Sequence, residues 1–229
     1  MEIIIRISKS IRYLTTIVML PALLPGCAFT DVHLDMPISG LEHPILGGNG
    51  REVVVGIPFN DTRKVTEHCG VQKNGYQRVT ADAICDTSPS LWISQLLTDE
   101  LRASRFKVLT PNEAHNDAAL RINGDIQKVF VEPVHGTWTM SLETDLQIKL
   151  IASTRDGLRA ERVFFAKGIK KGAMASTRSQ YQISLKRAAD EILAEMVEAI
   201  FLLMNKYPTI GIPDQPTKKD DKDFSEHEL

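Results

Sequence analysis

The chain has 229 residues, of which 43% are hydrophobic and 24% charged, and its 27 basic and 29 acidic residues give a net charge of −2. This near-neutral balance excludes the strong basic field typical of nucleic-acid-binding proteins, so we expect no nucleic-acid partner. A chain of about 200 residues can bury one sizeable core, and one globular domain is therefore expected.

Residues 1–26 have the organisation of a signal peptide. Three basic residues precede a mostly apolar stretch, Tyr13 to Leu24, which at about 1.5 Å per helical residue is too short to cross a hydrocarbon core of about 30 Å. The run closes on LPGC, ending at Cys27, which resembles the lipobox of bacterial lipoproteins. This resemblance implies that Cys27 becomes the mature N-terminus and carries acyl chains, palmitate among them, that anchor the protein to a membrane. The alternative is an ordinary secretory signal with an incidental cysteine.

The residue after the cysteine helps to decide which membrane holds such a lipoprotein. An Asp at that position favours the inner membrane in many species, whereas this chain has Ala28. We therefore expect an anchor in the outer membrane, on its periplasmic face. Once the signal peptide is removed, the mature chain holds 24 basic and 28 acidic residues.

With Cys27 assigned to lipid, Cys69 and Cys85 remain as a pair in an oxidising compartment. We expect a structural disulfide that closes a loop of about 16 residues and contributes roughly 3 kcal/mol by restricting the unfolded chain. Two free thiols or a regulatory bridge are the alternatives. Neither cysteine lies in a CxxC pair or at zinc-finger spacing, and we expect no metal and no cofactor.

Residues 27–50 are rich in glycine and proline and predict a flexible tether that reaches roughly 25–30 Å from the membrane. The following apolar, β-branched run, EVVVGIPF (52–59), is typical of a buried central strand. Residues 60–87 are polar and long for a loop, and we expect the Cys69–Cys85 bridge to hold them as an ordered flap. The Asn-Gly pair at 74–75 predicts the tip of a small hairpin there.

Residues 88–106 carry clear signals for a helix, because Ser88 can cap it, Pro89 suits its first position and the apolar residues follow one stripe. A short strand is predicted at residues 106–110, and the strand–helix–strand order indicates a right-handed crossover between parallel neighbours. From residue 118 to residue 170 the hydrophobic period becomes two over three segments, which predicts an antiparallel meander with one buried and one wet face.

Residues 176–207 predict a long second helix that lies flat on the sheet, and Pro208 ends it. The charged residues 208–229 predict a disordered tail. The globular domain is expected over residues 51–207. Its fold class is expected to be α+β, with a single mixed β-sheet of four to five strands and two helices packed on one face.

The element order strand–helix–strand–strand–strand–helix resembles that of the YajG-like family of uncharacterised bacterial lipoproteins, over roughly residues 50–205. The likeness rests on the lipobox, on VVVGIPFNDTR (53–63), on LLTDELRASRFKVL (96–109), and on the long hairpins that end in a helix. The first half is also similar to the amino-terminal domain of the periplasmic protein TolB. The resemblance implies a role in the cell envelope with no established chemistry.

The sequence has no pattern typical of an enzyme. Its six histidines are scattered, and it contains neither a nucleophile elbow nor a Walker motif. Asp61, Arg63 and Glu67 follow the first strand, where α/β folds often place sites, but a turn or capping role is the simpler interpretation. Trp138 is interpreted as core, and the two lysines at 170–171 as a solvated strand end. We therefore expect a protein that is not an enzyme.

Two non-enzymatic functions remain. The first is an interaction or assembly module that offers a sheet edge or the bridged loop to an envelope protein. The second is an accessory protein that binds or transports lipid or glycolipid in an apolar cleft between sheet and helices, similar in plan to the lipoprotein plug of lipopolysaccharide transport. We favour the first, because the long C-terminal helix is expected to cover the sheet and to leave little space for an acyl chain. A large open apolar cavity there would reverse this preference.

Overall fold

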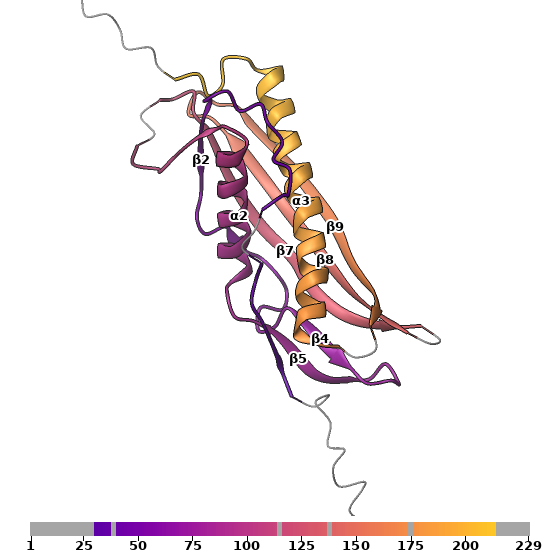
Figure 1. Ribbon diagram of the computed structural model, residues 1–229. Coiled ribbons are helices and arrows are strands. Elements are labelled where there is room, and N and C mark those ends of the chain that lie inside the picture. The colour runs from indigo at the N-terminus through magenta and orange to yellow at the C-terminus, as the bar shows by residue number, and fades with distance from the viewer. Residues whose placement is uncertain (1–29, 38–39, 114–115, 137–138, 174–175, 214–229) are drawn as a thin grey trace, which may run out of the picture.

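The computed structural model describes residues 30–37, 40–113, 116–136, 139–173 and 176–213 (Figure 1). The expected signal peptide (1–26), Cys27, Trp138 and the expected tail from residue 214 onward lie outside these ranges. Among the helices of the described part, none combines the length and the apolar character needed to cross a membrane.

Three long antiparallel strands form the main part of the sheet: β7 (Leu120–His135), β8 (Met140–Ser153) and β9 (Arg159–Ala173). In β8 every second residue from Met140 to Ala152 is buried, and the residues between them are half-buried. A strand places successive side chains on opposite faces, so this alternation separates a core face from a solvent face. The predicted meander is confirmed.

β7 pairs with further strands on its other side. Three strands lie parallel to successive stretches of β7: β2 (Glu52–Val55), β3 (Asn60–Asp61) and β4 (Gly70–Lys73). Beyond β2 the sheet continues with β6 (Lys107–Leu109), and beyond β4 it continues with β5 (Val79–Cys85) and then β1 (Val32–Leu34). β2 and β6 are parallel neighbours and a helix lies in the connection between them, which confirms the predicted parallel pairing.

The expected number of four to five strands is wrong, because the sheet of the described residues has nine. The additional strands include β1, β3 and β4, which have three, two and four residues. Such short segments show no readable period, and their pairing depends on partners far along the chain. The hairpin expected around residues 74–75 is present as the turn between β4 and β5.

The flexible tether expected over residues 27–50 is also wrong where the structure describes it. β1 lies in this segment and pairs in parallel with β5, and both Leu34 and Met36 are buried. Just before β1, the side-chain nitrogen Nε2 of Gln72 donates a hydrogen bond to the carbonyl oxygen of Thr30 at 2.6 Å. Two buried apolar residues between exposed neighbours give too little pattern to predict a strand from the sequence.

Two helices cover one face of the sheet, as predicted: α2 (Pro89–Ala103) and α3 (Arg178–Lys206) (Figure 1). The predicted apolar stripe of α3 faces the core, with Tyr181, Leu185 and Ile192 all fully buried. α3 ends two residues before Pro208, which cannot donate a helical hydrogen bond.

The backbone of α3 approaches the sheet closely at Gly168 of β9. A Cβ atom at this position would lie 1.9 Å from the carbonyl oxygen of Ser184 and 2.7 Å from the amide nitrogen of Ala188. The Ser184 hydroxyl lies 2.9 Å from the carbonyl oxygen of Gly168 and 2.8 Å from the hydroxyl of Thr144. Only glycine allows the helix and the strand to come this near at this point.

Candidate functional site

The first candidate site is the outer edge of β9. This strand pairs with β8 on one side, and no other described strand pairs with it on the other. On the face away from the helices, Phe165 is 63% exposed and Val163 is 38% exposed, although both are large apolar residues. An unpaired row of backbone donors and acceptors beside an exposed phenylalanine can accept a further strand.

Close to this edge, the charged side chains of the solvent face are paired across the strands. The ammonium nitrogen of Lys149 lies 2.5 Å from a carboxylate oxygen of Glu161. The ammonium nitrogen of Lys167 lies 2.7 Å from a carboxylate oxygen of Glu143. The hydrogen bond from Lys149 lowers the pKa of Glu161, and the hydrogen bond to Glu143 raises the pKa of Lys167. Exposed pairs of this kind add little to stability, but they leave Phe165 as an apolar spot among neutralised charges.

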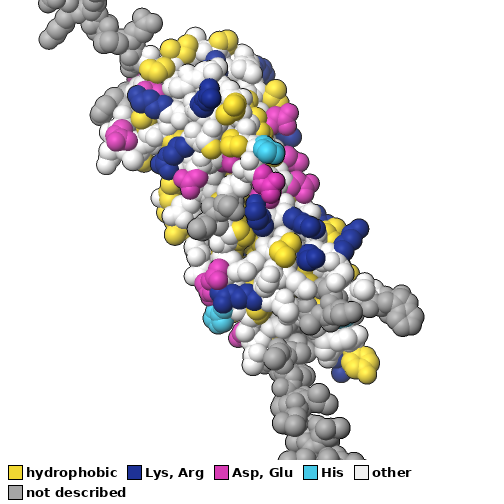
Figure 2. Space-filling model, in the orientation of Figure 1, with side chains coloured by type: hydrophobic (Ala, Val, Ile, Leu, Met, Phe, Trp, Pro, Cys, Tyr) yellow, Lys and Arg dark blue, Asp and Glu magenta, His cyan; other side chains and the backbone are white. Residues whose placement is uncertain are grey.

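The helix-covered face has a different character. Figure 2 shows this face, on which basic and acidic side chains are interspersed.

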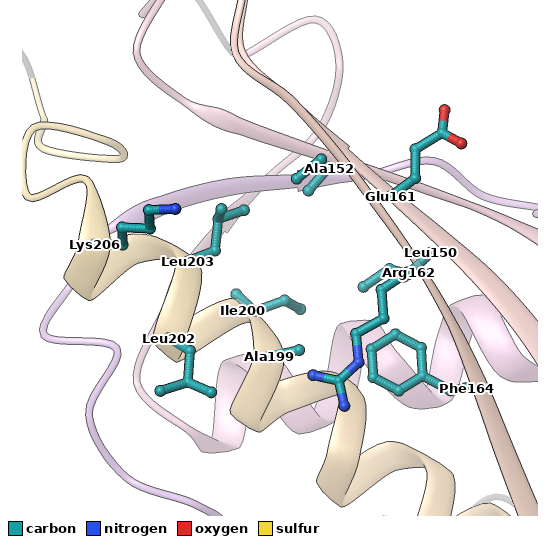
Figure 3. Close-up of a pocket in the computed structure, with 11 residues that line it drawn as sticks. Leu150, Ala152, Glu161, Arg162, Phe164, Ala199, Ile200, Leu202, Leu203 and Lys206 are labelled. Carbon is teal, nitrogen blue, oxygen red and sulfur yellow. The ribbon is translucent and has the colours of Figure 1, made fainter.

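The second candidate site is a groove between the C-terminal end of α3 and the neighbouring ends of β8 and β9 (Figure 3). Its volume is about 300 Å³. The apolar part of its lining comes from both layers and includes Leu150, Ala152, Phe164, Ala199, Ile200 and Leu203. The expectation that α3 leaves little space over the sheet is therefore wrong at this end of the helix.

Two cations belong to the lining of this groove. The guanidinium of Arg162 lies 4.9 Å from the centre of the Phe164 ring, and the ammonium of Lys206 lies 5.4 Å from the centre of the Tyr207 ring. Glu161 also lines the groove, but Lys149 and Arg159 already bind its carboxylate. The groove thus combines an apolar interior with a net positive charge.

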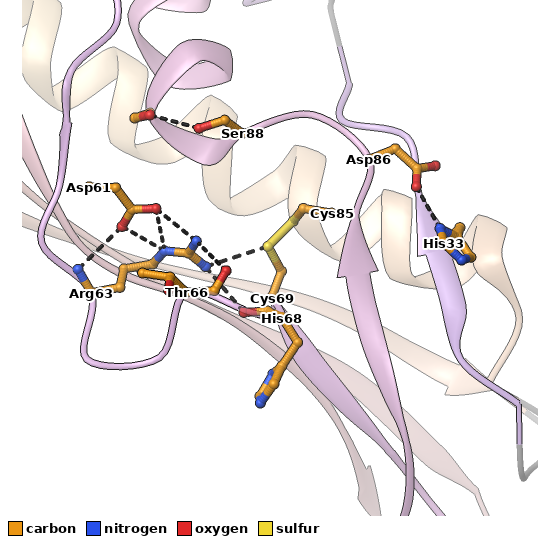
Figure 4. The surroundings of a disulfide bond; sticks show 10 residues. His33, Asp61, Arg63, Thr66, His68, Cys69, Cys85, Asp86 and Ser88 are labelled. Atoms are coloured by element: carbon orange, nitrogen blue, oxygen red, sulfur yellow. Dashed lines mark hydrogen bonds and ion pairs between the residues drawn. A yellow bond between two sulfur atoms is a disulfide. The ribbon is translucent and has the colours of Figure 1, made fainter.

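The third candidate site is the bridged region, in which Asp61 and Arg63 lie beside the disulfide (Figure 4) and Glu67 follows in the same loop. Cys69 and Cys85 form the expected disulfide, which joins the start of β4 to the end of β5. This bridge closes the base of the β4–β5 hairpin and so links the two strands covalently.

Arg63 is buried beside the disulfide, and its three side-chain nitrogens all donate hydrogen bonds. Nε and Nη2 donate to the Asp61 carboxylate at 2.9 and 2.8 Å, and Nη1 donates to the carbonyl oxygen of His68 at 3.2 Å. The side-chain hydrogen bonds from Arg63 to its carboxylate lower the pKa of Asp61. The carboxylate of Glu67 accepts a hydrogen bond from the backbone of Thr66 at 3.0 Å. Asp61, Arg63 and Glu67 thus act in holding the loop.

The histidines lie apart. Of the six, His115 and His227 lie outside the described residues, and His33 pairs with Asp86 at 2.7 Å on the surface. Across the described ranges, no three His, Cys, Asp or Glu side chains come together as a metal-binding group.

The sequence contains a signal for the β9 edge that the sequence analysis missed. Phe164 and Phe165 are adjacent in a strand, so one of the two must face away from the core. The groove has no such signal, because it depends on the position of α3 relative to β9.

The chain matches one protein family in sequence and several solved structures in fold. A family model described as uncharacterized lipoprotein matches residues 48–199. The crystal structure of a DUF330-family protein from Xanthomonas campestris is 11% identical, with a TM-score of 0.54, over 77% of this chain and 98% of that one. This likeness shows a shared fold. No curated protein matches the chain.

Two further solved structures are more distant. One is described only as an uncharacterized protein; it is 12% identical over 75% of this chain and 97% of its own, with a TM-score of 0.41. The other is described as a putative homolog of a neuraminyllactose-binding hemagglutinin from Helicobacter pylori. It is 12% identical over 76% of this chain and 96% of its own, with a TM-score of 0.37. Neither likeness is strong enough to support an inference.

Proposed function

This chain belongs to a family of uncharacterized lipoproteins, and we propose that it is a non-enzymatic interaction module, held by lipid at the periplasmic face of the outer membrane. The lipobox ending at Cys27 supports the anchor, and Ala28 after it supports the outer membrane. Acyl chains on Cys27 would supply the membrane attachment. That the protein is not an enzyme is part of this proposal, and it draws support from Asp61 and Arg63, whose polar groups are already bonded to each other and to the backbone.

The observation that carries the proposal is the unpaired edge of β9. This strand is 15 residues long, no described strand other than β8 pairs with it, and its exposed Phe165 gives an apolar contact beside the open edge. An extended segment of a partner protein can pair with such an edge through main-chain hydrogen bonds and place a side chain against Phe165. The partner we propose is therefore an envelope protein that contributes one strand.

A crosslinking experiment tests this proposal. A photoreactive phenylalanine analogue replaces Phe165 in the full-length protein in cells, and mass spectrometry identifies crosslinked proteins. We expect one recurrent partner, and we expect Phe165→Asp to abolish its co-purification. The matched control is Leu46, which is 60% exposed, and the variant Leu46→Asp should keep the partner. If no recurrent partner is found at position 165, or if both positions capture the same proteins, the proposal is wrong.

The groove beside α3 favours a second candidate function, the binding of an amphiphile. Its volume of about 300 Å³ is at the lower end of the range for ligand pockets. At about 30 Å³ for a group of the size of a water molecule, it holds on the order of ten such groups, which suits one acyl segment. Arg162 and Lys206 suit an anionic headgroup. Because the groove is small, amphiphile binding is the second candidate function, after strand pairing at β9.

This second function has its own test. We expect lipid extracted from the native protein to include an anionic amphiphile, and Ala199→Trp to remove it by filling the groove. Glu198→Trp is the control, because Glu198 is the exposed neighbour of Ala199 on the same helix and does not line the groove. Protein that is free of lipid, or lipid retained equally in both variants, would exclude this function.

A further inference from the structure

The start of the described chain is fixed beside the β4–β5 hairpin. Gln72 of β4 donates a hydrogen bond to the carbonyl oxygen of Thr30, and the backbone N–H of Asp82 in β5 donates to Asp31 Oδ1 at 2.9 Å. In Figure 1 the described chain begins at the same end of the molecule as this hairpin, opposite the C-terminal end of α3.

The direction of the chain leads toward the hairpin tip. β1 is parallel to β5, with Val32 opposite Ala83. Toward its N-terminal end, β1 therefore runs beside β5 in the direction of Val79, the first residue of β5. Val79 pairs with Lys73, next to the turn of the hairpin. Thr30, the first described residue, thus lies on the side of the domain where the hairpin turns.

The covalent distance to the anchor is short. Thr30 is the third residue after Cys27, and each residue of an extended chain spans at most about 3.6 Å. The Cα atom of Cys27 can therefore lie no farther than about 11 Å from that of Thr30. If Cys27 is acylated, as the proposed function assumes, the bilayer surface must come close to Thr30, which is hydrogen-bonded to Gln72 of the hairpin.

The hairpin tip has side chains suited to a lipid surface. Tyr76 is 87% exposed and Val79 is 59% exposed. Arg78 lies between them in the sequence and is exposed as well. A tyrosine has an apolar ring and a polar hydroxyl, so it is favoured at an interface between lipid and water. A basic residue near such a surface is attracted by anionic headgroups.

The hairpin is also firmly built. The Asn74 side-chain oxygen accepts hydrogen bonds from the backbone N–H groups of Tyr76 and Arg78, at 3.0 and 3.2 Å. The disulfide closes the base of the hairpin, and the buried hydroxyl of Tyr181 in α3 donates to the carbonyl oxygen of Val71 at 3.1 Å. The tip is therefore held in a fixed position relative to the domain.

We propose that the tip of the β4–β5 hairpin rests on the membrane that holds the Cys27 anchor, with Tyr76 in the headgroup region. The anchor and the tip then form two contacts with one bilayer, and the domain has a defined orientation on it. This inference rests on the proposed lipid anchor but not on the proposed strand pairing of β9.

The test uses the native, acylated full-length protein in vesicles of phosphatidylethanolamine and phosphatidylglycerol. A photoreactive phenylalanine analogue replaces Tyr76 in one sample and Leu46, which is 60% exposed, in the control sample. After irradiation, mass spectrometry measures lipid adducts at each position and the acyl mass on the N-terminal peptide. We expect a lipid adduct at position 76 and no lipid adduct at position 46.

Two other results would overturn this inference, and they differ in what they imply for the anchor. An acylated protein without a lipid adduct at position 76, or with equal adducts at both positions, overturns the inference and leaves the anchor intact. An N-terminal peptide without acyl mass removes the anchor, and with it both the membrane part of the proposed function and this inference.

Discussion

The substitution Gly168→Ala tests the close contact between α3 and β9. The added Cβ atom would lie 1.9 Å from the carbonyl oxygen of Ser184, whereas an ordinary contact of this kind is about 3.5 Å. Both neighbouring atoms, in Ser184 and Ala188, belong to the helix backbone and cannot rotate away. We therefore expect α3 to move outward by about 1.5 Å near this position.

The expected cost follows from two opposing effects. Overpacking of this kind costs about 1–3 kcal/mol, and lengthening the hydrogen bonds of Ser184 costs about 1 kcal/mol more. The preference of strands for alanine over glycine offsets about 0.5–1 kcal/mol. The net loss of about 2 kcal/mol corresponds to a decrease in Tm of about 4–8 °C for a domain of this size.

Urea unfolding and thermal unfolding, both followed by circular dichroism, measure this loss. Gly75→Ala is the matched control, because a Cβ atom at Gly75 would meet no heavy atom within 4 Å, and we expect its stability to change by less than about 0.5 kcal/mol. If Gly168→Ala is as stable as the native protein, the helix does not lie against the strand as described.

Three further perturbations test the bridged region and its attachment to α3. Reduction of the Cys69–Cys85 disulfide, which spans 16 residues, should lower the free energy of unfolding by about 3 kcal/mol, measured in urea with and without reductant; an unchanged midpoint would contradict this. Because Arg63 lowers the pKa of Asp61 below 3.8, that ion pair stabilises the fold fully above this pH and is lost as the pH falls through the folded pKa. Asp61→Asn should therefore flatten the acid limb of a pH–Tm profile and cost about 1–3 kcal/mol at neutral pH, and a profile parallel to that of the native protein would refute this. Burial raises the pKa of Tyr181 to about 12, so its contribution is complete below pH 10 and is lost as the pH rises through 12; Tyr181→Phe should cost about 1 kcal/mol and flatten the alkaline limb.

The parts of the fold that could be predicted are those with long, regular hydrophobic patterns. The stripe of α3 and the alternation in β8 each extend over many residues, and a long run of one period excludes the other kind of element. The crossover from β2 to β6 could be predicted because Pro89 and the apolar stripe mark the helix between them. For these elements the local sequence and the tertiary structure agree.

The parts that could not be predicted depend on distant segments. β1 forms only because β5, some fifty residues later, offers it a parallel neighbour, and Leu34 alone gives no pattern. The open edge of β9 is a property of the whole pairing order, since a strand is at an edge only if no other strand joins it. The groove depends on how α3 crosses the sheet, which a hydrophobic stripe does not determine.

The length of β7 has a consequence for where this protein would act. The groove lies level with Ile122, which pairs with Ala152, whereas β4 begins level with Val131 and continues toward the hairpin tip. At about 3.3 Å per residue, the groove and the level of Lys73 are roughly 40 Å apart. With its hairpin on the membrane, the protein would present the groove at a fixed height of that order within the periplasm. A ligand of the groove would then bind at one distance from the membrane, instead of anywhere within the reach of a flexible chain.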